Sequence, residues 1–239
     1  MKKTILLLLS QKDNSLYSFL EDNINKTWLS TKTEGCDIWY YYGNSEKFEV
    51  KDNVIMCPFG ESYANIGHKT LCAFEHLLQF DFDFIFRPNS SSFVNKERLV
   101  ELSQTFPTKN FYAGTPIHFL GGGIKEEDTI NAPTKCAHGC GFILSRDLVE
   151  LIVNNKDKWK HYMVDDMALC RFMKDFNIEL TELDKIFLNI DDSGNLNLDG
   201  QILSDEEIKK YHHIRTQSTN FDRKKNVEIM KKCFDICKN

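Results

Sequence analysis

Residues 82–95 read FDFIFRPNSSSFVN, an apolar stretch that passes into a polar loop and then returns to apolar residues. Phe84-Ile85-Phe86 has the composition of a buried strand, and the charged residues after Val94 predict a helix over 95–104. Between them stand an arginine, an amide and three hydroxyls, in RPNSSS at 87–92. Because ligands of open α/β sheets bind at the carboxyl ends of strands, this loop is the first candidate for a binding site.

Strands and helices alternate on both sides of this stretch. Apolar or aromatic runs predict strands over 4–9, 37–42, 54–57, 82–86, 142–144 and 186–190. Apolar residues at helical spacing predict helices over 15–28, 66–78, 95–104, 146–153, 165–176, 204–210 and 221–237. Such alternation is typical of a mostly parallel sheet that helices flank. We therefore expect one α/β domain over residues 1–239, which is long enough to bury a substantial core.

The glycine-rich stretch 111–143 differs from the rest of the chain. Its glycines separate short apolar and acidic pieces, which predicts loops that face a substrate. Gly139 and Gly141 lie in this stretch and would let the backbone approach a bound sugar closely, although a turn before the strand at 142–144 would need them as well.

The bulk composition argues against two classes of partner. Charged residues make up 27% of the chain, and the net charge of −5 provides no basic field for nucleic acid. The apolar run at 5–9 follows two lysines, but it is far too short for a membrane span and no small-residue cleavage pattern follows it. We expect a buried strand there, no integral membrane segment, and a cytoplasmic protein, in the host cytoplasm if the source is a virus.

The eight cysteines are scattered, several within apolar stretches where free thiols behave as small buried hydrophobes. Reduced thiols are the simplest expectation. Cys136, His138 and Cys140 have the spacing of half a zinc site, but no second pair stands at ligand spacing, which argues against zinc.

Asp165 and Asp166 are the strongest catalytic signal in the chain. A carboxylate within hydrogen-bond reach of a hydroxyl can take its proton while the hydroxyl attacks. Acidic residues are also favoured at a helix N-terminus by the helix dipole, so the pair has a structural explanation too. The two explanations are compatible, because one aspartate can stabilise the helix while the other reacts.

Four separated blocks, taken together, resemble the Fringe and β-1,3-galactosyltransferase group of glycosyltransferases. They are 24–28 (INKTW), 61–70 (ESYANIGHKT), 83–95, and 138–145 (HGCGFILS) with 164–167 (VDDM) after it. The resemblance spans residues 4–180 and implies a GT-A-like fold. It also implies transfer of a sugar from a nucleotide diphosphate donor, usually a UDP-sugar, to a hydroxyl of a glycan or glycoconjugate acceptor, with inversion at the anomeric carbon. Asp166 matches the family's base, and Lys69 matches a further family position, although a surface lysine is the simpler expectation for it.

The loop at 89–91 departs from this family. Its members carry consecutive aspartates where this chain has Asn89, Ser90 and Ser91, and those aspartates ligate manganese beneath the diphosphate. The acidic motif cannot be carried over, so the metal ligands are unknown and the cofactor is either Mn²⁺ or none. Asp81 and Asp83 do not replace the motif, because they precede the strand and are expected at its solvated start.

Neutral donors and cations are expected to replace the missing carboxylates. Arg87, Asn89, Ser90 and Ser91 can donate hydrogen bonds to phosphate or sugar oxygens, helped by backbone N–H groups if the serines open the next helix. The alternative is that the loop is a plain turn and helix cap.

Two other segments join the predicted donor site. Ser10 begins the polar loop after the first strand. In the segment 211–215 (YHHIR), His213 and Arg215 are expected to face the leaving diphosphate while Ile214 enters the core. A structural role for His213 is the alternative.

Two other functions stay open. The chain is either an active transferase or a catalytically silent relative that binds a nucleotide or glycan as a recognition module. Loss of the acidic loop fits the silent relative, whereas retention of Asp165 and Asp166 argues against it. A nucleotidyltransferase is a weaker alternative, because it would require a carboxylate pair at the strand ends that the sequence does not provide.

Overall fold

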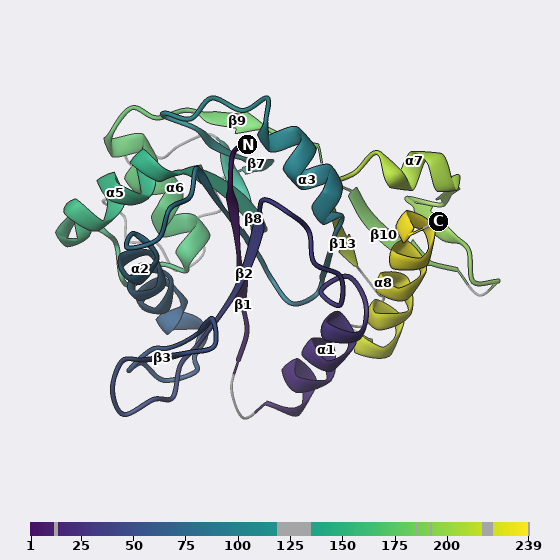
Figure 1. Ribbon diagram of the computed structural model, residues 1–239, viewed down its shortest axis with the longest axis horizontal. Helices are drawn as coiled ribbons and strands as arrows, with labels where there is room; N and C mark the ends of the chain where they lie inside the picture. The colour runs from purple at the N-terminus through teal and green to yellow at the C-terminus, as the bar shows by residue number, and fades with distance from the viewer. Residues whose placement is uncertain (12–13, 119–134, 185, 192, 217–221, 239) are drawn as a thin grey trace.

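The computed structural model describes residues 1–11, 14–118, 135–184, 186–191, 193–216 and 222–238. An eight-stranded sheet forms its centre, in the order β3-β4-β2-β1-β5-β8-β7-β9 (Figure 1). The strands are β1 (Thr4–Leu9), β2 (Cys36–Tyr42), β3 (Glu49–Lys51), β4 (Val54–Met56), β5 (Phe84–Pro88), β7 (Tyr112–His118), β8 (Lys135–Ser145) and β9 (Leu180–Glu182). The pairs β4–β2, β2–β1, β1–β5 and β7–β9 are parallel, whereas β8 runs antiparallel to both of its neighbours. The α/β class expected from the sequence is confirmed.

Helices cover both faces of this sheet. They are α1 (Ser15–Lys26), α2 (Ile66–Leu77), α3 (Lys96–Ser103), α5 (Arg146–Asn154), α6 (Asp165–Asp175), α7 (Asp205–Lys209) and α8 (Arg223–Lys238). Figure 1 shows α2, α5 and α6 on one face, and α1, α3 and α8 on the other. Alternate residues of β1 serve the two cores: Ile5 and Leu7 pack in the first, and Leu6 and Leu8 pack in the second. A run that is apolar at every position is what a strand covered on both faces requires.

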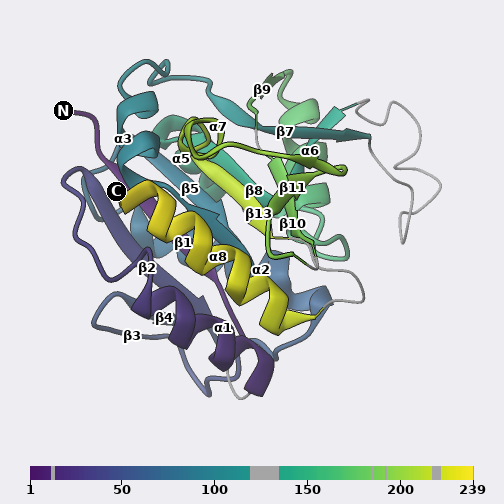
Figure 2. The same ribbon diagram turned by 90° about the vertical axis from the view of Figure 1, so that its right-hand side faces the viewer.

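A smaller sheet, which we did not predict, lies beside α8 (Figure 2). Its order is β12-β11-β10-β13-β6, with β6 (Ser92–Val94), β10 (Ile186–Ile190), β11 (Leu196–Leu198), β12 (Gln201–Ile202) and β13 (His213–Thr216). The antiparallel pair β13–β6 sets Arg215 opposite Ser92. The segment HIRT is therefore joined to the serine loop that follows β5.

Most predicted elements agree with the structure to within a few residues. The strand over 4–9 has the predicted bounds, and Asn14 caps α1 by accepting hydrogen bonds from the backbone N–H groups of Leu16 (3.0 Å) and Tyr17 (3.4 Å). The expectation of loops is wrong for residues 112–118 and 135–141, because β7 and β8 form an antiparallel pair there. Residues 119–134 of that stretch lie outside the described residues.

Cys136 of β8 and Cys170 of α6 form a disulfide. The expectation of reduced thiols is therefore wrong for this buried pair, and Cys136 is also removed as a zinc ligand. The other six cysteines are thiols. Within the described ranges, no helix has the length and apolar character needed to cross a bilayer.

Candidate functional site

A cavity of about 260 Å³ opens where β1 and β5 end and α6 begins. Its described lining residues are Leu9, Tyr17, Leu20, Tyr63, Ile66, Arg87, Asn89, Ser90, Ser91, His138, Gly139, Cys140, Val164, Asp165, Asp166, Arg215 and Arg223. The cavity thus brings together the loop after β5, the start of α6, the middle of β8 and the end of β13. Most of the site residues predicted from sequence meet in it, although they come from segments far apart in the chain.

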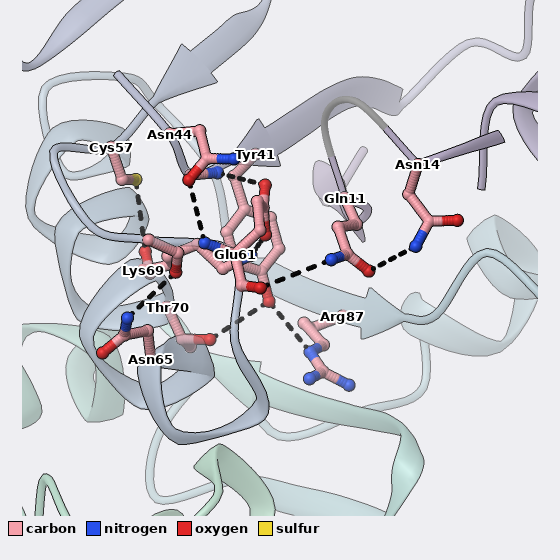
Figure 3. A network of polar contacts seen from close by, with 12 residues as sticks. Gln11, Asn14, Tyr41, Asn44, Cys57, Glu61, Asn65, Lys69, Thr70 and Arg87 are labelled. Carbon is pink, nitrogen blue, oxygen red and sulfur yellow. Dashed lines mark hydrogen bonds and ion pairs between the residues drawn. The ribbon is translucent and has the colours of Figure 1, made fainter. Parts of the chain in front are cut away.

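Arg87 and Asp165 form a buried ion pair beneath this cavity, and each residue is only 1% exposed. The Arg87 guanidinium also donates from Nη1 to the Gly139 carbonyl (2.7 Å) and from Nε to the Tyr41 hydroxyl (3.1 Å). Figure 3 shows Thr70 and Arg87 meeting at the Tyr41 hydroxyl. Direct contact between Arg87 and a donor was expected. Arg87 does line the cavity, but its guanidinium is engaged by Asp165, the Gly139 carbonyl and the Tyr41 hydroxyl.

Asp166 is the second carboxylate at this end of α6, and its environment differs from that of Asp165. Burial raises the pKa of Asp166 to about 6, and the neighbouring charge of Asp165 acts in the same direction. The Met167 N–H donates to Asp166 Oδ1 at 2.9 Å, while the helix cap is Val164 and neither aspartate caps through its side chain. At neutral pH Asp166 is an ionised carboxylate whose pKa suits proton transfer.

The loop after β5 is folded around one oxygen. The Asn89 Oδ1 accepts hydrogen bonds from Arg215 Nη1 (3.1 Å) and from the hydroxyls of Ser92 (3.2 Å) and Ser91 (3.4 Å). Arg215 Nη1 also donates to the Ser91 carbonyl at 2.8 Å. The side-chain oxygen of Asn89 therefore anchors a guanidinium, and the amide oxygen is not available to ligate another group.

The serines do not open a helix, so the condition for help from helical backbone N–H groups is not met. Ser92 begins the strand β6, and α3 starts only at Lys96, where Asn95 caps it by accepting from the Arg98 N–H at 3.1 Å. Ser90 and Ser91 still line the cavity, so their hydroxyl and backbone groups remain candidates for ligand contact.

His213 and Gly141 are packed against each other behind the cavity and are not among its described lining residues. His213 is 2% exposed, its Nε2 lies 2.9 Å from the Ser92 hydroxyl, and its ring packs edge-on against Phe86. A Cβ at position 141 would lie 2.6 Å from His213 Cε1, so Gly141 makes room for the imidazole and not for a sugar. The structure therefore does not place His213 or Gly141 among the described residues that line this cavity, where contacts with the donor were expected.

A neighbouring cavity of about 180 Å³ shares Leu9, Tyr17, Tyr63 and Ile66 with the first and holds the predicted residue Ser10. Lys69 also lines it, and the expectation of a surface lysine is wrong. Lys69 is 2% exposed and forms a buried ion pair with Glu61; both residues are labelled in Figure 3. Glu61 in turn accepts a hydrogen bond from the Gly43 N–H at 2.5 Å. The buried pair fixes the loop around Glu61 at the rim of the site.

Several lining residues were not recognised in the sequence. His138 was considered only as a zinc ligand, yet it lines the cavity, and its Nδ1 accepts from the Cys140 N–H at 3.1 Å, which places the proton of a neutral ring on Nε2. Arg223, the first residue of α8, was read as an ordinary helix residue. Arg223 reaches the cavity that Arg215 lines because α8 packs against the small sheet, and no local sequence pattern indicates this packing.

The residues of the cavity do not fit a manganese site. Mn²⁺ is held by several oxygen ligands, chiefly carboxylates. Asp165 is committed to Arg87 and the Asn89 oxygen to Arg215, which leaves Asp166 as the remaining carboxylate among the described lining residues. Across the ranges that the structure describes, no three His, Cys, Asp or Glu side chains are grouped to bind a metal.

No protein-family model matches the sequence, and no curated protein matches it. Among solved structures, the chain is similar to a glycosyltransferase involved in the glycosylation of the major capsid of PBCV-1. The TM-score is 0.48 at 10% sequence identity, and the match covers 95% of this chain and 99% of that one. The resemblance to the Fringe and β-1,3-galactosyltransferase group stays a prediction from sequence.

Proposed function

We propose that this protein is a GT-A-like glycosyltransferase that moves a sugar from a nucleotide diphosphate donor to a hydroxyl of a glycan or glycoconjugate. One observation carries the proposal: Asp166, a carboxylate whose pKa is raised to about 6, shares a cavity with the Asn89 loop and Arg215. A proton acceptor and a group of hydrogen-bond donors and cations thus stand around one space. Transfer of a glycosyl group requires both.

The reaction would follow from this arrangement. The acceptor hydroxyl attacks the anomeric carbon and gives its proton to the Asp166 carboxylate. The bond between that carbon and the diphosphate oxygen breaks, and its electron pair leaves with the nucleoside diphosphate. Attack opposite the leaving group inverts the anomeric centre, and Asp166 later releases its proton to water. Three details of the proposal come from the sequence resemblance: a UDP-sugar as the donor, a glycan or glycoconjugate as the acceptor, and inversion at the anomeric carbon.

Arg87 and Asp165 would act as positioning residues. The ion pair fixes the first turn of α6, and the Arg87 bond to the Gly139 carbonyl fixes the strand that faces Asp166. The base is therefore held between two rigid elements, which is how an enzyme limits the loss of orientation that slows proton transfer. The proposed domain extends over residues 1–239, since both sheets contribute residues to this one cavity.

A panel of nucleotide sugars tests the proposal by thermal unfolding, with and without Mn²⁺, followed by an assay of transfer. A donor that binds the native state raises the melting temperature. We expect one donor to do so and to be transferred by the wild type but not by Asp166→Asn. If no donor at millimolar concentration shifts the melting temperature, the proposal fails. A donor that stabilises the wild type but is never transferred would instead identify a silent binding module.

A further inference from the structure

We propose that Arg215 and Arg223 form a diphosphate subsite that works without a metal ion, and that Asn89 is the anchor of this subsite. The inference rests on the proposed function, since it names the groups that hold the leaving part of the donor. It follows from the mismatch between the cavity and a manganese site.

Arg215 has one anchored edge and one open edge. Both hydrogen bonds given by its Nη1 go to the loop after β5, to Asn89 Oδ1 and the Ser91 carbonyl. Its Nε and Nη2 donate to no other described residue, and the side chain lines the cavity. A guanidinium held in this way offers a fixed pair of N–H groups, which matches two oxygens of a phosphate.

Arg223 supplies a second positive charge in the same space. It lines the cavity and forms no hydrogen bond or ion pair with another described residue. Arg215 and Arg223 line the same cavity. Burial lowers the pKa of Arg215, and the charge of Arg223 acts in the same direction. Two cations that repel each other in a partly buried cavity are stabilised by an anion between them.

The amide at position 89 explains why the two cations stay available. An aspartate there would accept the same hydrogen bond from Arg215, but it would also neutralise the guanidinium. Asn89 provides the oxygen without the charge, so that Arg215 keeps its positive charge for a ligand. The absence of carboxylates from this loop therefore explains how Arg215 can be anchored to the loop and still keep its positive charge for a ligand.

Calorimetric titration with inorganic pyrophosphate in EDTA tests the subsite. We expect the wild type to bind pyrophosphate, and Arg215→Met and Arg223→Met each to weaken binding about tenfold or more, as loss of a charge-assisted hydrogen bond predicts. Lys224→Met is the matched control, because Lys224 is the exposed neighbour of Arg223 on α8. The Lys224→Met variant should bind pyrophosphate with the same affinity as the wild type. Arg215→Lys keeps the charge and should bind more tightly than Arg215→Met.

Asn89→Asp separates the anchor from the charge. The variant keeps an oxygen for Arg215 and should fold normally, yet its affinity for pyrophosphate in EDTA should fall about tenfold. Unchanged affinity in Arg215→Met and Arg223→Met, or binding by the wild type only when Mn²⁺ is present, would overturn the subsite. If a nucleotide sugar is nevertheless transferred, the subsite fails and the glycosyltransferase stands. If the arginines bind pyrophosphate but no sugar is transferred, the anion site stands and the proposed function fails.

Discussion

Gly139 lies directly against the carboxylate of Asp166. A Cβ built on Gly139 would be 2.3 Å from Asp166 Oδ2 and 2.8 Å from Cγ, closer than any real side chain tolerates. The position of the proposed base is therefore set by a strand that must lack a side chain at this one point. The glycine that we first assigned to a sugar contact makes room for the carboxylate.

Gly139→Ala should displace Asp166 and lower kcat about a hundredfold, because a misplacement of about 1 Å is enough for such a loss. Steady-state kinetics with the transferred donor measures the effect. Gly60→Ala is the control, since a Cβ at Gly60 would meet its nearest neighbour at 3.4 Å, an ordinary contact. If kcat of the Gly139→Ala variant equals that of the wild type, the position of Asp166 does not affect the reaction and Asp166 is not the base.

The rate of transfer should depend on pH through Asp166. Its pKa is raised to about 6, and the proposed base accepts a proton only when it is ionised. We expect kcat/KM to be constant above about pH 7 and to fall as pH decreases through 6. The measurement is a profile of kcat/KM from pH 5 to 8. A profile without a decrease in this range would assign the base to another group.

Asp166→Asn should stabilise the folded protein at neutral pH while it removes activity. The folded state binds the Asp166 proton more tightly than the unfolded state, so the stability of the wild type falls as pH rises from the ordinary carboxyl pKa to about 6. Above that pH, the neutral amide should increase the free energy of unfolding by up to about 3 kcal/mol, since each pKa unit corresponds to about 1.4 kcal/mol. Urea denaturation at pH 8 and at pH 4 checks this. The difference should be present at pH 8 and absent at pH 4, and an equal difference at both would assign the gain to packing.

Replacing only one partner of the buried Arg87–Asp165 ion pair should destabilise the folded protein. Arg87→Met or Asp165→Asn leaves an unpaired buried group, and we expect each to lower the free energy of unfolding by about 3–5 kcal/mol. The double variant Arg87→Met, Asp165→Asn should lose less than the sum of the two single changes. Asp81→Asn, which breaks the exposed pair with Lys3, serves as the control and should leave the melting temperature unchanged. Additive losses in the double variant would show that the two residues act independently.

Local patterns were sufficient to predict most of the central sheet and its helices. Some features depend only on residues that are close together in the sequence. Examples are the apolar run of β1, the Asn14 cap and the spacing of apolar residues in α2. The cavity could be predicted in outline, because carboxyl ends of parallel strands share an edge. The loop at 87–92 was expected at such an edge, and it lines the cavity together with Asp166.

Long-range pairing could not be predicted in the same way. The contact between Asn89 and Arg215 joins residues 126 positions apart, through two short strands whose sequences give weak signals. Whether a cation is free or paired depends on burial by other segments. For that reason the partners of Arg87, Lys69 and His213 were not predicted: each residue is held by a partner that only the folded chain supplies.

The buried disulfide between Cys136 and Cys170 joins two elements that carry site residues. It crosslinks the strand that carries Gly139 to the helix that begins with the two aspartates, across a sequence separation of 34 residues. Dithiothreitol should therefore lower the melting temperature, by the equivalent of about 4 kcal/mol, and slow transfer. The Cys136→Ser, Cys170→Ser variant should be insensitive to the reagent. Disulfides persist in oxidising compartments and are rare in the cytosol. The disulfide in the structure therefore disagrees with the cytoplasmic location predicted from the sequence. Buffers and expression hosts that keep thiols reduced should therefore yield a protein with a lower melting temperature.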